Sequence, residues 1–158
     1  MKAAKTVIAI CLAALPVLAA FPQQRGSPLR TDHDIQALCE ETLANVVAGD
    51  VSRGIGALRP YATGISVEDV DSLETQLRGQ AATITKNYGD PLGFVFISGE
   101  NLRDTVMRLV YIVKYQRHMI RWSFIFYRPV DSWILDYVNY DDSVEALFGL
   151  KSPPAPTR

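Results

Sequence analysis

The sequence is poor in the residues that build metal centres and disulfide frameworks. Its 158 residues include only two cysteines and two histidines. Two cysteines cannot make a disulfide framework or a cysteine-rich zinc site. His33 and His118 fall in different expected elements, the start of a helix and a tight hairpin. We therefore expect no metal ion and no cofactor.

Known catalytic motifs and an excess of charge are also missing. The chain has no Gly-x-Ser-x-Gly turn, no glycine-rich phosphate loop and no His-Glu-x-x-His pair. A formal charge of -1 does not suit a nucleic-acid-binding protein, which would carry a basic excess or stripe. With 48% hydrophobic and 21% charged residues, the composition is that of a globular chain too short for two domains. No motif assigns a catalytic residue.

The N-terminus has the three parts of an export signal. Lys2 and Lys5 precede an apolar run over residues 7–15, and small residues follow at Ala19 and Ala20. The run is shorter than the roughly 20 residues that a membrane-spanning helix needs. The pattern predicts a signal peptide over residues 1–20, cleaved after Ala19 or Ala20, and a periplasmic or secreted protein with no stable membrane anchor. An uncleaved anchor is the alternative.

The rest of the chain divides into a linker, one domain and a tail. Residues 21–31 show no periodicity, and residues 151–158 form a proline-rich tail that we expect to be disordered. One compact domain over residues 32–150 is left between them. Its only cysteine is Cys39, whose place on an apolar helical stripe predicts a small buried hydrophobic residue. A reactive or intermolecularly paired thiol is the alternative.

Helical spacing dominates the first half of the domain. Apolar residues recur at this spacing from Ile35 to Val47, and Gly49 is a natural stop. A short helix over residues 51–58 is weakened by two glycines. A long helix is predicted from the capping residue Ser66 to Tyr88, because Glu68 and Asp69 suit a first turn and seven apolar residues then share one face.

The second half alternates with a period of two, which is typical of strands. Strands are predicted over residues 92–97, 105–115, 120–127 and 133–138, with a turn at residues 98–101 and a helical turn after Asp141. Short connections between them imply an antiparallel meander. The fold class is therefore α+β, with N-terminal helices, including one long helix, packed on a curved sheet of about four strands.

Particular segments carry a family resemblance. These are Tyr88-Gly89-Asp90-Pro91 before the first strand, the strand over residues 109–115, and Trp122 to Pro129 followed by residues 131–135. Together they resemble the nuclear-transport-factor-2-like superfamily (cystatin-like α+β fold), especially its small exported bacterial members without assigned function. The resemblance covers about residues 32–150. It implies a cone-shaped domain with a pocket at one end, and a homodimer formed through the outer face of the sheet.

The same resemblance implies where a ligand pocket would lie. Enzymes of the superfamily use Asp, His or Tyr side chains that project into the cone, and the corresponding positions are Tyr61, Tyr111, Tyr115 and Asp136. Asp136 could act as a general base, but the alternation places it on the outer side of its strand, opposite Trp133, Leu135 and Tyr137. Four further aromatic residues would line a pocket for a small apolar ligand or fill the core, namely Trp122, Phe124, Phe126 and Trp133.

Basic residues gather on the two middle strands and their hairpin. They would bind an anionic ligand or a lipid surface, or else protect the sheet from aggregation, which is the preferred interpretation; they are Arg108, Lys114, Arg117, Arg121 and Arg128. The function expected from the sequence is a non-enzymatic module for small-molecule binding or protein association. The alternatives are a lyase or isomerase with acid/base residues in the cone, and a structural subunit that dimerises through the outer sheet face. No nucleic-acid partner is expected.

Overall fold

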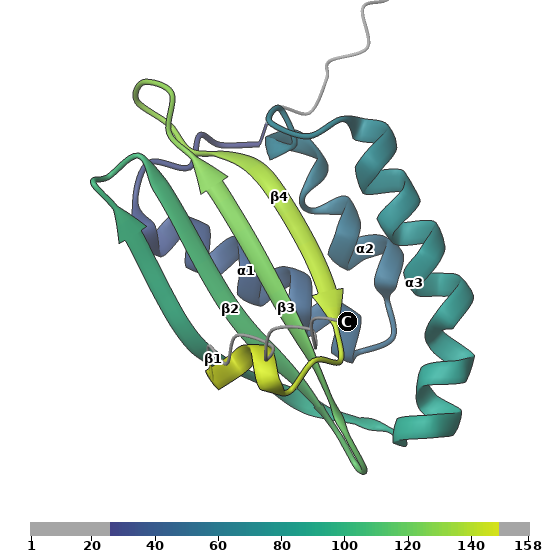
Figure 1. Ribbon diagram of the computed structural model, residues 1–158. Helices are drawn as coiled ribbons and strands as arrows, with labels where there is room; N and C mark the ends of the chain where they lie inside the picture. The colour runs from purple at the N-terminus through teal and green to yellow at the C-terminus, as the bar shows by residue number, and fades with distance from the viewer. Residues whose placement is uncertain (1–25, 149–158) are drawn as a thin grey trace, which may run out of the picture.

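A computed structural model describes residues 26–148, in which three helices precede a four-stranded antiparallel sheet (Figure 1). The elements are α1 (Asp32–Val47), α2 (Val51–Gly56), the 3-10 helix η1 (Arg59–Tyr61), α3 (Val67–Tyr88), β1 (Pro91–Leu102), β2 (Val106–Tyr115), β3 (Met119–Tyr127), β4 (Ile134–Asp141) and the 3-10 helix η2 (Glu145–Phe148). The fold is α+β, as predicted, and the sheet is open, not closed into a barrel. The predicted signal peptide and the proline-rich tail lie outside the described residues.

Side-chain caps fix the start of both long helices. Thr31 accepts a hydrogen bond from the backbone of Asp34 at 3.1 Å, and the Asp34 carboxylate accepts from the backbone of Thr31 at 2.9 Å. Ser66 and Asp69 make the same reciprocal pair at the start of α3. Such pairs satisfy amide groups that a helix leaves free in its first turn. Within residues 26–148, no helix is long and apolar enough to cross a membrane.

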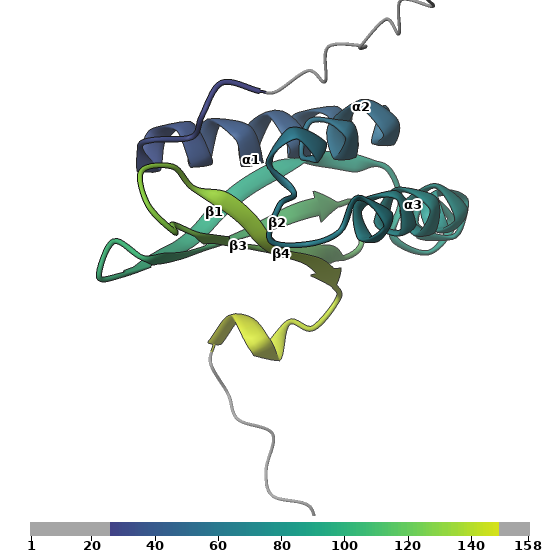
Figure 2. The same cartoon turned by 90° about the horizontal axis from the view of Figure 1, so that it is seen from above.

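The sheet has the strand order β1-β2-β3-β4, with a layer of helices on one face and one short 3-10 helix on the other (Figure 2). α1 and α2 cover one face, which we call the inner face, and η2 lies on the opposite, outer face. α3 runs at the side of the sheet, beyond β4. It packs on α2, and its only buried residues are Val70 and Leu77, so the long helix borders the sheet while α1 covers it. Cys39 is fully buried on α1, which confirms its prediction as a buried hydrophobic residue.

β1 is longer than the sequence predicted. Residues 98–101, predicted to be a turn, continue the strand to Leu102, and the turn follows at Arg103 and Asp104. Both turn residues have positive φ, 54° and 56°, and the Asn101 side chain accepts a hydrogen bond from the Asp104 amide at 2.8 Å. The predicted turn was wrong because residues 98–101 are polar or glycine, which is typical of turns. An edge strand with one side in water accepts such residues as well. Two register shifts, between Pro91 and Gly93 and between Phe96 and Ser98, interrupt its pairing with β2.

A β-bulge at Asp136 changes which residues of β4 face the core. Phe126 pairs with Leu135 and the preceding Ile125 pairs with Tyr137, so Asp136 is the extra residue. A bulge shifts the alternation of side chains by one position. Leu135 is fully buried before it, whereas Tyr137 is 46% exposed after it. The expectation that Tyr137 shares a face with Trp133 and Leu135 is therefore wrong.

The backbone of Gly64 lies against this bulge. Its amide donates to the carbonyl oxygen of Leu135 at 3.2 Å. A methyl group at Gly64 would lie 2.8 Å from the same oxygen and 2.9 Å from the Cα of Asp136. The close approach of two backbones thus requires glycine at this position.

We predict that Gly64→Ala lowers the free energy of unfolding by roughly 1–3 kcal/mol, because the added methyl group would push β4 away. Gly79→Ala is the matched control, since a methyl group at this exposed position of α3 meets nothing within 4 Å. The control should stabilise the protein by about 0.5–1 kcal/mol, because alanine favours the helix interior. Urea denaturation followed by circular dichroism measures both values. Equal effects of the two substitutions would contradict the contact at the bulge.

Candidate functional site

Five of the predicted pocket residues pack together on the inner face of the sheet. Each has at most 1% of its surface exposed; they are Tyr111, Trp122, Phe124, Phe126 and Trp133. The rings of Tyr111 and Phe124 meet edge to face with centroids 6.1 Å apart, and Trp122 stacks on Phe124 at 6.0 Å. These distances are typical of packed aromatic pairs. The rings fill the core, which was the alternative to lining a pocket.

Two of these core residues have a polar atom that forms no hydrogen bond in the described structure. The Tyr111 hydroxyl and the Trp133 indole nitrogen are buried and make no hydrogen bond in the described structure, and the same holds for the Thr42 hydroxyl of α1. Burial raises the pKa of Tyr111 far above its usual value of about 10. Its phenol therefore stays protonated near neutral pH.

The other three predicted residues have separate surroundings. Tyr61 lies in a surface cleft beside Ser27 and Glu41. The Tyr115 ring meets that of Tyr88 edge to face at 6.2 Å. Asp136 is exposed at the bulge and has no partner on β3. Asp136 and a tyrosine are thus not brought together in a pocket, as an acid/base mechanism in the cone would need.

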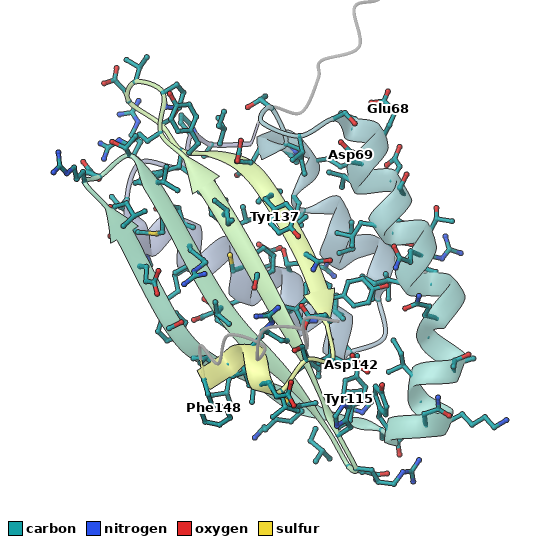
Figure 3. The ribbon with its side chains drawn as sticks, viewed as in Figure 1. Glu68, Asp69, Tyr115, Tyr137, Asp142 and Phe148 are labelled. Atoms are coloured by element: carbon teal, nitrogen blue, oxygen red, sulfur yellow. The ribbon has the colours of Figure 1, made fainter. Side chains whose placement is uncertain are left out.

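A cleft of about 230 Å³ opens between α3 and the end of the sheet, where the sequence singled out no residue for a site. From α3 it is lined by Gln76, Gln80, Ile84 and Tyr88, and from the sheet and the segment after it by Ile120, Tyr140, Asp141 and Asp142. Figure 3 shows Asp142 and Tyr115 at the end of the molecule where α3 finishes. The bulge shifts the alternation of β4 by one residue, and Tyr140 therefore faces inward, opposite Trp122. A strand pattern without a bulge does not predict this orientation.

Hydrogen bonds join the two sides of this cleft. The Tyr88 hydroxyl donates to Oδ2 of Asp142 at 2.9 Å, and the Tyr140 hydroxyl donates to Oε1 of Gln80 at 3.0 Å. The bond to Asp142 raises the pKa of Tyr88, and burial raises the pKa of Tyr140. Both phenols therefore remain protonated donors at neutral pH. Tyr140 is held on its other side by Trp122, whose ring is 5.2 Å away.

The basic residues predicted to gather on the middle strands are mostly paired. Arg108 binds Glu100 at 2.8 Å, Arg121 binds Asp141 at 2.6 Å, and Arg128 binds Asp104. Arg117 donates to the carbonyl oxygens of Lys86 and Asn87 at the end of α3. Only Lys114 has no such contact within residues 26–148. This arrangement favours the protective interpretation, because a site for an anion would leave more of these charges free.

Apolar residues lie together on the outer face of the sheet, at the end where β1 finishes. Cross-strand pairs place Leu102, Val106, Tyr127 and Ile134 in one row and Ile125 and Tyr137 in the next. We call these six residues the outer patch. Leu102 is 63% exposed and Tyr127 is 40% exposed. η2 covers the neighbouring part of the face, where Ala146 and Leu147 lie near Val110, and no element within residues 26–148 covers the outer patch.

Comparison of the chain with protein-family models, with curated proteins and with solved structures gave no match. The resemblance to the nuclear-transport-factor-2-like superfamily therefore depends on the quoted segments and on the order of elements.

We predict that Tyr111→Phe leaves the free energy of unfolding at pH 7 unchanged or raises it by up to about 1 kcal/mol, because the lost hydroxyl has no partner. Tyr140→Phe should lower it by about 1 kcal/mol, since this hydroxyl bonds Gln80. Urea denaturation at pH 7 measures both. A clear loss in Tyr111→Phe would mean that the hydroxyl is paired.

The wild type and Tyr111→Phe together test the raised pKa of Tyr111. Tyrosines of the unfolded chain lose their protons near pH 10, whereas folded Tyr111 keeps its proton. Stability from this group is thus complete below pH 10 and is lost as the pH rises further. Between pH 9 and 11 the wild type should lose more stability than Tyr111→Phe. Equal losses would show that the pKa of Tyr111 is ordinary.

Proposed function

We propose that the protein is an exported, non-enzymatic association module that pairs with a second copy of itself through the outer patch. The observation that carries this proposal is the exposure of Leu102, Tyr127 and Tyr137 in adjacent rows on one sheet face. Contiguous apolar surface of this kind marks interaction sites in soluble proteins. Tyrosine is also among the residues enriched at interfaces.

The close packing of the inner face supports the proposal, because it leaves none of the five predicted pocket residues packed there free to bind a ligand. Its largest rings are buried in contact with one another, so the residues predicted to line a pocket are used for folding. The outer patch is an apolar part of the sheet that the described helices leave exposed. Figure 3 shows Tyr137 on the sheet face turned away from α1 and α2.

The charges around the outer patch suit a symmetric pair. Arg108 with Glu100 and Arg128 with Asp104 are neutral pairs at its border. In a twofold dimer the same surface meets itself, and unpaired charges of one sign would repel. Because these charges are balanced within each chain, two copies can approach without net repulsion.

The other functions named by the sequence have less support. A lyase or isomerase would need Asp136 near a tyrosine inside a cavity, and Asp136 is exposed at the bulge. A small apolar ligand among the inner-face rings would need space that the packed core does not provide. Membership of the nuclear-transport-factor-2-like superfamily remains a proposal, supported by the order of helices and an antiparallel meander.

Sedimentation velocity of the chain without residues 1–20 tests the association. We predict a dimer at tens of micromolar and a monomer for Tyr137→Lys, because a charged ammonium group would be buried in the interface. Leu92→Lys is the control, since Leu92 is 62% exposed at the far end of β1. The control should remain dimeric.

Two results would overturn this proposal. One is a wild type that stays monomeric at high concentration. The other is an equal loss of dimer in Tyr137→Lys and Leu92→Lys, which would place the interface elsewhere.

A further inference from the structure

The cleft beside α3 has a carboxylate that nothing in the described chain neutralises. Asp142 accepts a hydrogen bond from the neutral phenol of Tyr88, and no Lys, Arg or His within residues 26–148 forms an ion pair with it. The adjacent Asp141 differs, because Arg121 binds it in a two-contact pair. The cleft therefore carries one net negative charge from its lining carboxylates.

The polar atoms of the cleft include carboxylate and phenol oxygens, which accept hydrogen bonds, beside the side-chain amides of Gln76 and Gln80. Tyr88 and Tyr140 give their hydroxyl protons to Asp142 and to Gln80. Each phenol oxygen keeps its lone pairs for a further partner. A positively charged ligand fits the Asp142 carboxylate and can donate to the phenol oxygens, whereas an anion would be repelled by the carboxylate.

The walls of the cleft are aromatic and aliphatic. Tyr88 and Tyr140 bring rings to it, and Ile84 and Ile120 bring aliphatic side chains. Aromatic rings attract organic cations through their electron-rich faces. The Tyr140 ring is fixed by its stack on Trp122, and the Tyr88 ring by contacts with Tyr115 and His118. The site is thus formed before a ligand arrives, which lowers the entropic cost of binding.

We propose that this cleft binds a small organic ammonium cation, whose charge meets Asp142 and whose carbon atoms lie against Tyr88 and Tyr140. The cleft, of about 230 Å³, has room for a simple alkylammonium or quaternary ammonium ion. A bare metal ion is a poorer fit, because residues 26–148 contain no group of three His, Cys, Asp or Glu side chains able to hold one. The site differs from the apolar pocket expected from the sequence in both place and chemistry.

Choline and its neutral isostere 3,3-dimethylbutan-1-ol are suitable probes, because they differ in charge and hardly in shape. Calorimetric titration of the chain without residues 1–20 should show saturable 1:1 binding of choline, at least tenfold tighter than that of the alcohol. Amide signals of Ile84, Tyr88 and Tyr140 should shift in two-dimensional NMR spectra during the same titration.

Asp142→Asn tests the charge while keeping an oxygen that can accept from Tyr88. It should weaken choline binding at least tenfold and leave binding of the alcohol unchanged. Asp131→Asn is the control, since Asp131 is an exposed carboxylate in the loop between β3 and β4. This control should bind choline like the wild type.

Three results would overturn the proposal. They are the absence of saturable choline binding, equal affinity for choline and the alcohol, and equal losses in Asp142→Asn and Asp131→Asn. The proposal is independent of association through the outer patch. Tyr137→Lys should retain choline binding, and Asp142→Asn should remain a dimer.

Discussion

The packing of aromatic side chains from β2 and β3 under α1 is the constraint on which the rest of the structure depends. Tyr111, Trp122 and Phe124 form one continuous set of ring contacts on the inner face. Close packing of this kind leaves little room for a ligand between helices and sheet. A ligand or partner would therefore bind at the cleft between α3 and the sheet, or on the outer face of the sheet. Both functional proposals follow from this division.

A single extra residue in β4 determines what those two surfaces contain. Before Asp136, the inward residues are Trp133 and Leu135; after it, they are Val138 and Tyr140. The same shift turns Tyr137 to the outer face. Without the bulge, the outer patch would lose its central tyrosine and the cleft would lose one aromatic wall. Gly64 holds the bulge from outside through its bond to Leu135.

Much of the fold could be predicted because its signals are local. The cap at Ser66, the helical stripe through Cys39 and the alternation in β2 and β3 depend on neighbours in sequence. The bulge at Asp136 could not be predicted, because it depends on a backbone contact with residue 64. The cleft was missed for a similar reason: Tyr88 and Asp142 meet only in the folded chain. The core aromatics were recognised as one group, but periodicity alone cannot distinguish a filled core from a pocket lining.

The irregular pairing of β1 has a consequence for solubility. Its segment from Leu92 to Gly99 contains no charged residue, and Val95, Phe96 and Ile97 are each about 40% exposed at the edge of the sheet. Proteins commonly protect such edges with lysine or proline, but here the interior of the strand has neither. The two register shifts distort the row of free amide and carbonyl groups, which makes the edge a poor template for another strand. Protection against fibril-like stacking thus resides in backbone geometry, and a change that straightened β1 would remove it even if the folded domain became more stable.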